Sequence, residues 1–515
     1  MRRLTIPLLV AAALGGCGTN PVTGQKELQL VSEQQELAIG AENYGPSRQM
    51  QGGDYVVDPA VEAYVQEVGQ RLAQMSDRQL PYEFSVINNS VPNAWALPGG
   101  KIAVNRGLLT ELGSEAELAA VLGHEIVHAA ARHGAKSMQR GMFTQGALAT
   151  LALTMDDTRY AGLLVGGAQV GAQLVTTKYG RDAESESDKY GMRYMARAGY
   201  NPLAAVTLQE TFVRLSEGQQ SGWLDGLFAS HPPSIERVEA NRKTAAELGD
   251  KGDYGTDRYL AAIKPLLDSK EAYAAFDKAM QAYTQSDMKA ARSFVNQAVR
   301  AEPREARFHA LLGDINARGK RNDDALSAYT RAITNNPEYF PAYLGRGLVR
   351  QRMNKLDLAA TDLQKSIDLL PTATAHNALG QIEQKRGHLD QAAEHFRVAS
   401  GSQSEVGQAA ALSLARIDLP RNPGAYLETA VDVDRQQQVV VLVGNRSGVP
   451  VRNIELEVAV LDASGSTVVQ RRPVAVGQIL QPGDRVALST GIGPVKSAND
   501  LRRVRVEVRA AQIAE

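Results

Sequence analysis

The stretch HEIVH, residues 124–128, combines two histidines four residues apart with a glutamate directly after the first. In an α-helix, positions four apart are offset by only ~40° around the axis, so both imidazoles project from one face. Converging imidazoles are typical ligands of Zn²⁺, and an adjacent glutamate is suited to act as a general base on water. The pattern therefore predicts a zinc hydrolase site that contains His124, Glu125 and His128.

The residues around this stretch favour a helix. Ser114, followed three residues later by Glu117, is typical of a capping box, and Gly134 is a suitable end. Gly123 lies inside the helix at a cost of ~1 kcal/mol relative to alanine, so we expect another group to approach the backbone there. The alternative is a structural helix with two hydrogen-bonded histidines. With 8 histidines in 515 residues, chance produces the pattern in fewer than about one unrelated chain in a hundred.

A catalytic zinc site needs a third protein ligand. On a continuous helix His133 would lie ~140° to 180° around the axis from His124 and His128, so it is predicted to sit near the helix C-terminus, outside the site. The next glutamate after His128 is Glu184, in the run RDAESESDKYG, and Asp188 follows it four residues later.

In a helix, Glu184 and Asp188 share one face, whereas Glu186 points away from it. Two carboxylates on one face suit a metal ligand and an acceptor for the second ring nitrogen of a histidine ligand. Taken alone, such an acidic face is usually solvated. The histidines upstream favour the metal site.

Four segments together carry a family resemblance: HEIVHAAARH, ESESD, NAWALPGGKIAVNRGLL and SHPPSIERV. They resemble the Ste24/HtpX-type zinc metalloproteases, and within these the exported group that carries tetratricopeptide repeats. The resemblance covers residues from about 30 to about 400. It implies a mainly α zincin-type domain with a small β-sheet, one Zn²⁺ per chain, Glu184 as the third ligand and Asp188 behind a ligand.

The resemblance also implies residues near the metal in SHPPSIERV. His231 would approach the metal as a resting-state fourth ligand or near the transition state, and Arg237 would lie close by. An ordinary loop histidine before two prolines is the alternative. Residues 98–105, PGGKIAVN, are expected to form the edge strand to which an extended substrate adds backbone hydrogen bonds, with a purely structural edge strand as the alternative.

The first residues have the layout of an export signal. MRRLTIPLLVAAALGGC has two arginines, an apolar run too short to span a membrane, and small residues before Cys17, the single cysteine. LGGC resembles the lipobox of bacterial lipoproteins, which implies removal of the signal peptide 1–16 and acylation of Cys17. Gly18 then implies the outer membrane. We expect residues 17–55 to form a tether and a short helix capped by Ser32.

Beyond residue 250 the chain has an internal repeat. Pro303, Pro337 and Pro371 are spaced by 34 and 34 residues, and each ends a helical pattern. Small and aromatic residues between them occur at tetratricopeptide spacings, where the aromatic fills the gap between two closely packed helices. The pattern predicts an α-solenoid of about four repeats over residues 270–402, with a plain helical bundle as the alternative.

The remaining regions complete a multidomain organisation. The zinc metalloprotease domain is expected over residues 56–255, and period-2 alternation with SG and PGD turns predicts a β-sandwich of unknown use over 425–515. The apolar, glycine-rich run 146–177 is short for a membrane span, so we expect packed helices or a lid, with bilayer contact as the minority alternative.

Composition and resemblance together give the functional prediction. With 56 basic and 57 acidic residues, the chain has no net field that favours nucleic acid. We predict a periplasmic zinc endopeptidase anchored to the outer membrane by lipidated Cys17. The resemblance implies unfolded or misassembled envelope proteins as substrates, and repeats that bind a partner such as the outer-membrane assembly machinery. The alternative is a non-enzymatic assembly scaffold or chaperone, but an intact Glu125 argues against it, because a structural metal site needs no base.

Overall fold

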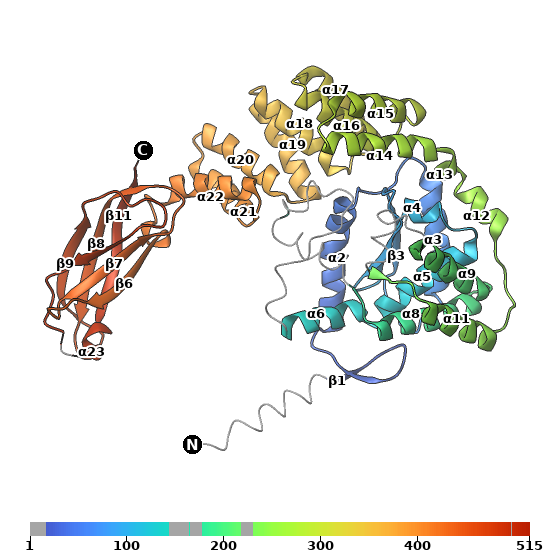
Figure 1. Ribbon diagram of the computed structural model, residues 1–515, viewed down its shortest axis with the longest axis horizontal. Helices are drawn as coiled ribbons and strands as arrows, with labels where there is room; N and C mark the ends of the chain where they lie inside the picture. Colours follow the sequence, from blue (N-terminus) through green and yellow to red (C-terminus); the bar gives the residue numbers. More distant parts are fainter. Residues whose placement is uncertain (1–16, 144–163, 165–177, 218–229, 496, 515) are drawn as a thin grey trace, which may run out of the picture. The chain divides into compact units, whose positions relative to one another are not determined.

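The computed structural model describes residues 17–143, 164, 178–217, 230–495 and 497–514 (Figure 1). The chain divides into two compact units, Met1–Pro371 and Thr372–Glu515. The predicted signal peptide and almost all of the apolar run 146–177 lie outside the described residues. Within the described residues, no helix is both long enough and apolar enough to cross a membrane.

The first unit begins with a small three-stranded sheet and the helices around it, drawn in blue to green in Figure 1. The strands are β3 (Glu83–Ile87), β4 (Ala94–Leu97) and β5 (Lys101–Asn105). The helices are α2 (Glu33–Met50), α3 (Pro59–Ala73), α4 (Arg106–Leu109), α5 (Glu115–Ala130), α6 (His133–Phe143), α8 (Arg181–Arg197), α9 (Leu203–Glu217), α11 (Ile235–Leu248), α12 (Thr256–Ala262) and α13 (Lys264–Asp268).

The sheet has the order β3–β5–β4, so the prediction that residues 98–105 form an edge strand is wrong. β5 is the central strand, parallel to β3 and antiparallel to β4, with Val104 opposite both Val86 and Ala94. Every residue of β5 is buried. Its apolar run is typical of a strand that is covered on both faces. Strand β4 lies at the edge instead.

The N-terminal segment is an ordered hairpin and not an extended tether. β1 (Cys17–Thr19) pairs antiparallel with β2 (Lys26–Leu28). The Asn20 side chain closes the turn by accepting hydrogen bonds from two backbone amides. The residues NPVTG therefore form a turn, although their composition is also typical of a linker. The helix that follows begins after Ser32 as predicted, and Ser32 forms a capping box with Gln35.

Helix α5 begins as predicted but ends earlier. The Ser114 side chain caps its first turn. The helix stops at Ala130, because Arg132 adopts a positive φ of 62° and His133 starts the next helix, α6. An ion pair of 2.9 Å between Arg132 Nε and the buried Glu36 Oε2 holds this break. Gly134, predicted as the helix end, instead lies within α6.

Gly123 is where α5 and α8 cross. A Cβ atom on Gly123 would lie 3.1 Å from the carbonyl oxygen of Gly191, and one on Gly191 would lie 2.9 Å from the carbonyl carbon of Gly123. The contact at Gly191 would force the backbone to shift and the one at Gly123 is tighter than most Cβ contacts, so a side chain at either position would push the helices apart. The group expected to approach the backbone at Gly123 is therefore the second glycine, on α8.

Three helix pairs of the solenoid belong to the first unit, and the predicted tetratricopeptide packing is confirmed there. A Cβ on Gly313 would lie 2.6 Å from the ring of Tyr329, so the aromatic fills the space that the glycine leaves. The helices are α14 (Lys270–Thr284), α15 (Met288–Ala301), α16 (Ala306–Arg318), α17 (Asn322–Asn335), α18 (Phe340–Arg352) and α19 (Leu356–Leu369).

The first repeat shares a hydrophobic core with the sheet and its helices. At the junction, the buried Glu305 carboxylate accepts hydrogen bonds from Asn88 Nδ2 (2.8 Å) and from the Tyr273 hydroxyl. Arg307 donates to the backbone carbonyl of Asn88. The buried Arg106 guanidinium lies over the Tyr273 ring, 3.2 Å from its centroid. These contacts make the first repeat, together with the start of α16 in the second, an integral part of the unit.

The second unit contains the last helices and two three-stranded sheets. The sheets, ordered β10–β7–β6 and β11–β8–β9, pack over one apolar core, which confirms the predicted β-sandwich. The elements are α20 (Ala373–Lys385), α21 (Leu389–Ala399), α22 (Glu405–Asp418), η2 (Pro423–Ala425), β6 (Leu427–Val433), β7 (Val439–Asn445), β8 (Val451–Leu461), β9 (Val468–Val476), β10 (Arg485–Ser489), α23 (Ala498–Leu501) and β11 (Val504–Ile513).

Replacing Glu305 tests whether the junction between the repeats and the sheet stabilises the first unit. We expect Glu305→Ala to lower the free energy of unfolding by about 2–4 kcal/mol, because buried Asn88 and Tyr273 lose their acceptor. The exposed Asp323→Ala is the control and should cost less than about 1 kcal/mol. Urea unfolding followed by tryptophan fluorescence measures the change, since both tryptophans, residues 95 and 223, precede residue 371. Equal effects of the two substitutions would contradict an integral junction.

Candidate metal centre

Helix α5 carries three of the candidate residues on adjacent positions of one face. The Nε2 atoms of His124 and His128 are 3.0 Å apart, and the planes of the two rings meet at 66°. His128 and Glu125 are 1% and 2% exposed, so this part of the helix is removed from solvent. The structure thus brings the two imidazoles to one point.

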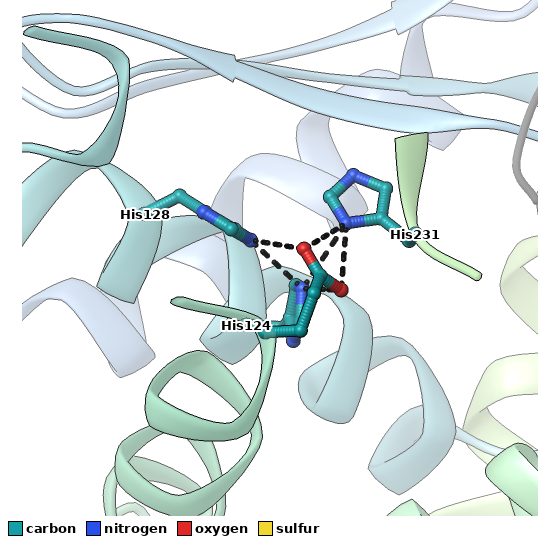
Figure 2. Close-up of side chains that lie close together, drawn as sticks. His124, His128 and His231 are labelled. Carbon is teal, nitrogen blue, oxygen red and sulfur yellow. Dashed lines mark hydrogen bonds and ion pairs between the residues drawn. The ribbon is translucent and has the colours of Figure 1, made fainter. Parts of the chain in front are cut away.

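Two further side chains reach the same point from other parts of the chain. Glu184, in the first turn of α8, lies with Oε1 3.4 Å from His128 Nε2 and Oε2 3.5 Å from His124 Nε2. His231, just before α11, lies with Nδ1 3.1 Å from Glu184 Oε1 and 3.3 Å from His124 Nε2. Figure 2 shows the three imidazoles directed toward one another.

The spacing of these donor atoms fits one metal ion. The four ligand atoms, one from each side chain, all lie within 4.8 Å of one another. Tetrahedral coordination with bonds of ~2.0–2.1 Å places neighbouring ligand atoms ~3.3–3.4 Å apart, close to the separations of 3.0–3.5 Å seen here. Three imidazole nitrogens and a carboxylate, all buried, are suitable ligands for a divalent transition metal.

Asp188 and Arg237 lie behind the cluster. Asp188 Oδ1 is 2.9 Å from His124 Nδ1, so that nitrogen carries the proton and Nε2 presents its lone pair to the cluster. The Arg237 guanidinium donates twice to Asp188 at 2.7 Å and forms an ion pair of 3.0 Å with Glu184 Oε2. Arg237 thereby holds both Glu184 and Asp188 of α8.

The charges at the site favour a cation at its centre. Burial opposes ionisation of Glu184, but the imidazoles around it hold its pKa well below the usual range. Burial likewise opposes ionisation of Asp188, but Arg237 lowers its pKa to about 2. Burial lowers the pKa of His128, whereas at His124 hydrogen bonds to Asp188 and Glu184 outweigh burial and raise the pKa to about 10. The carboxylates thus stabilise one positive charge, and a metal ion competes with a proton for that place.

Glu125 is buried next to the cluster but lies outside the set of four. Its Oε1 is 3.5 Å from His231 Nε2, and its Oε2 has no hydrogen-bond partner among the described residues. Burial raises the pKa of this carboxyl. A carboxylate with a raised pKa and a free oxygen beside a metal site is suited to take up and return a proton.

A cavity of about 60 Å³ adjoins His124 and Glu125. Polar groups of Arg237 and Asn241 contribute to its wall, but most of the wall is apolar. At ~10–15 Å³ per water-sized sphere it has room for roughly four to six such spheres, about the size of a leucine side chain. The apolar lining residues are Ala94, Leu108, Ala120, Val121, Met192, Ala205, Leu208 and Phe212.

Comparison with known proteins identifies this arrangement. Residues 59–245 match the model of peptidase family M48, and residues 270–340 and 344–405 match a tetratricopeptide repeat model. The chain carries an M48 peptidase domain. This confirms the predicted family, and it makes the protein a metalloendopeptidase with a metal-dependent site.

Three relatives show how far the similarity extends. The chain is 26% identical over 463 residues to the beta-barrel assembly-enhancing protease of Escherichia coli (strain K12), across 81% of this chain and 93% of the relative. It is 32% identical over 158 residues to the mitochondrial metalloendopeptidase OMA1 of Arabidopsis thaliana, across 31% of this chain and 30% of the relative. It is 30% identical over 177 residues to metalloprotease LoiP of Escherichia coli (strain K12), across 33% of this chain and 66% of the relative.

The M48 domain also has contacts behind His128 that the sequence did not reveal. His133 Nδ1 lies 3.0 Å from His128 Nδ1, and His133 Nε2 lies 3.6 Å from Glu186 Oε1. The Tyr179 ring stacks on His128 with centroids 4.0 Å apart. The prediction that His133 sits at the C-terminus of the same helix is wrong, because the helix breaks at Arg132. Neither glycine nor proline marks that break in the sequence.

Asp188→Asn tests the role of the carboxylate behind His124. We expect zinc affinity to fall by about 10–100-fold, because the uncharged amide holds the His124 ring less firmly and leaves Arg237 with Glu184 as its only charged partner among the described residues. Competition with a chromophoric chelator measures the affinity. Asp182→Asn, at an exposed position of the same helix, should change it by less than about 2-fold. Unchanged affinity in Asp188→Asn would show that Asp188 does not position the ligand.

Proposed function

We propose that this metalloendopeptidase holds one Zn²⁺ through His124, His128 and Glu184, with Glu125 as the general base. The convergence of the buried donor atoms beside an unsatisfied carboxylate oxygen carries the proposal. Imidazole ligands favour zinc over Mg²⁺ and Ca²⁺, which take mainly oxygen ligands.

The chain's own groups can move the proton that peptide hydrolysis requires. A bound Zn²⁺ would supply Lewis acidity toward the scissile carbonyl and the attacking water. Glu125 Oε2 accepts the proton of that water and returns it to the leaving amine, and its raised pKa suits both transfers. Asp188 keeps the proton of His124 on Nδ1 throughout, so that His124 remains a ligand.

His231 contributes the fourth ligand atom of the cluster in this structure. A catalytic zinc site keeps one position open for water or substrate. We therefore propose that His231 is the resting-state fourth ligand and moves away when substrate binds. Arg237, which donates to the backbone carbonyl of Pro232 at 3.0 Å, holds the base of the His231 loop during that movement.

Strand β4 and the apolar cavity suit an extended polypeptide substrate. In the described residues β4 pairs only with β5, and Ala94 of β4 also lines the cavity. All four residues of β4 are buried, so we propose that its second edge becomes available for backbone hydrogen bonds as an extended substrate enters. Backbone hydrogen bonds to β4, combined with a single apolar pocket for one side chain, would allow the enzyme to bind unfolded chains of many sequences.

The proposed biological role follows from the relatives and the N-terminal motif. A relative that matches most of the chain is named a beta-barrel assembly-enhancing protease. We propose that the substrates are misfolded or stalled envelope proteins and that the repeats bind them or the outer-membrane assembly machinery. The LGGC motif supports a periplasmic location with anchoring to the outer membrane through lipidated Cys17.

Glu125→Gln separates catalysis from metal binding. We expect cleavage of an unfolded protein such as casein to fall by at least about 1000-fold, because the amide cannot accept the proton. Zinc content should stay at one ion per chain, since Glu125 is not a ligand. Glu117→Gln, an isosteric change on the same helix, is the control and should retain activity. Wild-type protein that holds zinc but cleaves no unfolded protein would refute the proposed peptidase activity.

The cavity predicts which side chains are accepted next to the scissile bond. We expect Ala205→Leu, which fills the cavity, to lower kcat/KM about 10–200-fold for peptides with leucine at the preferred position, and much less for alanine. A peptide series varied on both sides of the cleaved bond measures this. Ala246→Leu, exposed on α11, is the control. A uniform loss for all peptides would show that the cavity does not select side chains.

A further inference from the structure

The N-terminal hairpin, residues 17–31, is bound to the M48 domain by buried polar contacts. Asn20 is 1% exposed, and its Nδ2 donates to Glu186 Oε1 at 2.9 Å and to Glu27 Oε1 at 3.3 Å. Lys136 of α6 forms an ion pair of 2.6 Å with Glu27 Oε2. Strands of three residues do not form a stable hairpin alone. The contacts with α6 and α8 therefore hold it in place.

The same Glu186 oxygen leads to the metal ligand His128. Because His128 presents Nε2 to the cluster, its proton is on Nδ1, which donates to His133 Nδ1 at 3.0 Å. His133 then carries its own proton on Nε2, which faces Glu186 Oε1 at 3.6 Å. One assignment of protons is thus compatible with the His128–His133 hydrogen bond, the His133–Glu186 contact and the Asn20–Glu186 hydrogen bond.

The end of the hairpin also holds the helix break that places His133. The Arg132 guanidinium donates to the Gln29 side chain and to the backbone carbonyl of Val31, each at 2.5 Å. Arg132 is the residue with positive φ between α5 and α6. Because the chain turns there, His133 comes back against His128 instead of continuing along α5.

We propose that the N-terminal hairpin is a positioning element of the metal centre, which holds the ring of His128 through Asn20, Glu186 and His133. The hairpin thus orients the His128 ring from its Nδ1 side, as Asp188 orients the His124 ring from its Nδ1 side. The inference rests on the metal site proposed above, but its test needs no proteolysis. Asn20, Glu186 and His133 are positioning residues, since none of them lies in the ligand cluster.

Substitutions in the full-length protein test the hairpin's role through metal binding. We expect zinc affinity, measured by chelator competition, to fall about tenfold in Glu186→Ala and several-fold in Asn20→Ala. The visible absorption of the cobalt-substituted protein should shift in both, because the His128 ring tilts at the metal. Glu186→Gln should lose less affinity than Glu186→Ala, since its amide oxygen still faces His133 Nε2 but carries no charge.

Asp182→Ala, an exposed carboxylate in the first turn of the same helix, is the matched control and should leave affinity and spectrum unchanged. Wild-type affinity and spectrum in both Glu186→Ala and Asn20→Ala would overturn the proposal. So would an equal loss in Asp182→Ala or Glu186→Gln, which would assign the effect to helix stability. Wild-type protein that binds zinc without cleaving would refute the peptidase proposal and leave this one intact.

Discussion

The close crossing of α5 and α8 is the constraint on which the metal centre depends. Gly123 and Gly191 let the two backbones touch, as only residues without a side chain allow. His124 follows Gly123 directly, and Asp188 and Glu184 lie about one and two helical turns before Gly191. Since the donor atoms are only 3.0–3.5 Å apart, a wider separation of the helices would pull the carboxylates away from the imidazoles.

Charge balance explains why so many ionisable groups can be buried together. Glu125, Glu184 and Asp188 bring three negative charges when ionised, and Arg237 brings one positive charge. A divalent ion makes this buried set neutral, whereas without it the net charge would be costly in a medium of low polarity. Burial raises the pKa of Glu125, whereas at His124 hydrogen bonds to Asp188 and Glu184 outweigh burial and raise the pKa. Metal binding, proton affinity and the folded state are therefore linked in this site.

The sequence predicted what depends on local periodicity. Four-residue spacing placed His124 with His128 and Glu184 with Asp188 on shared helix faces, and the spacing of the prolines gave the repeats. The features that sequence missed depend on distant partners. The break before His133 is held by contacts of Arg132 with residues about a hundred positions earlier. Likewise β5 is central because β3 and β4 pair with its two edges, and the hairpin is ordered because α6 and α8 bind it.

Rigid attachment at both ends of the M48 domain limits how the enzyme meets its substrates. Cys17 and Asn20 are three positions apart, so their Cα atoms are at most ~11 Å apart, and the proposed lipid on Cys17 would hold the metal centre near the membrane surface. At the other end, the first repeat shares the domain's core through Tyr273, and Glu305 at the start of α16 accepts hydrogen bonds from Asn88 and Tyr273. Neither end is a free tether. A chain to be cleaved must therefore supply the flexibility itself, and this favours unfolded or stalled polypeptides over folded ones.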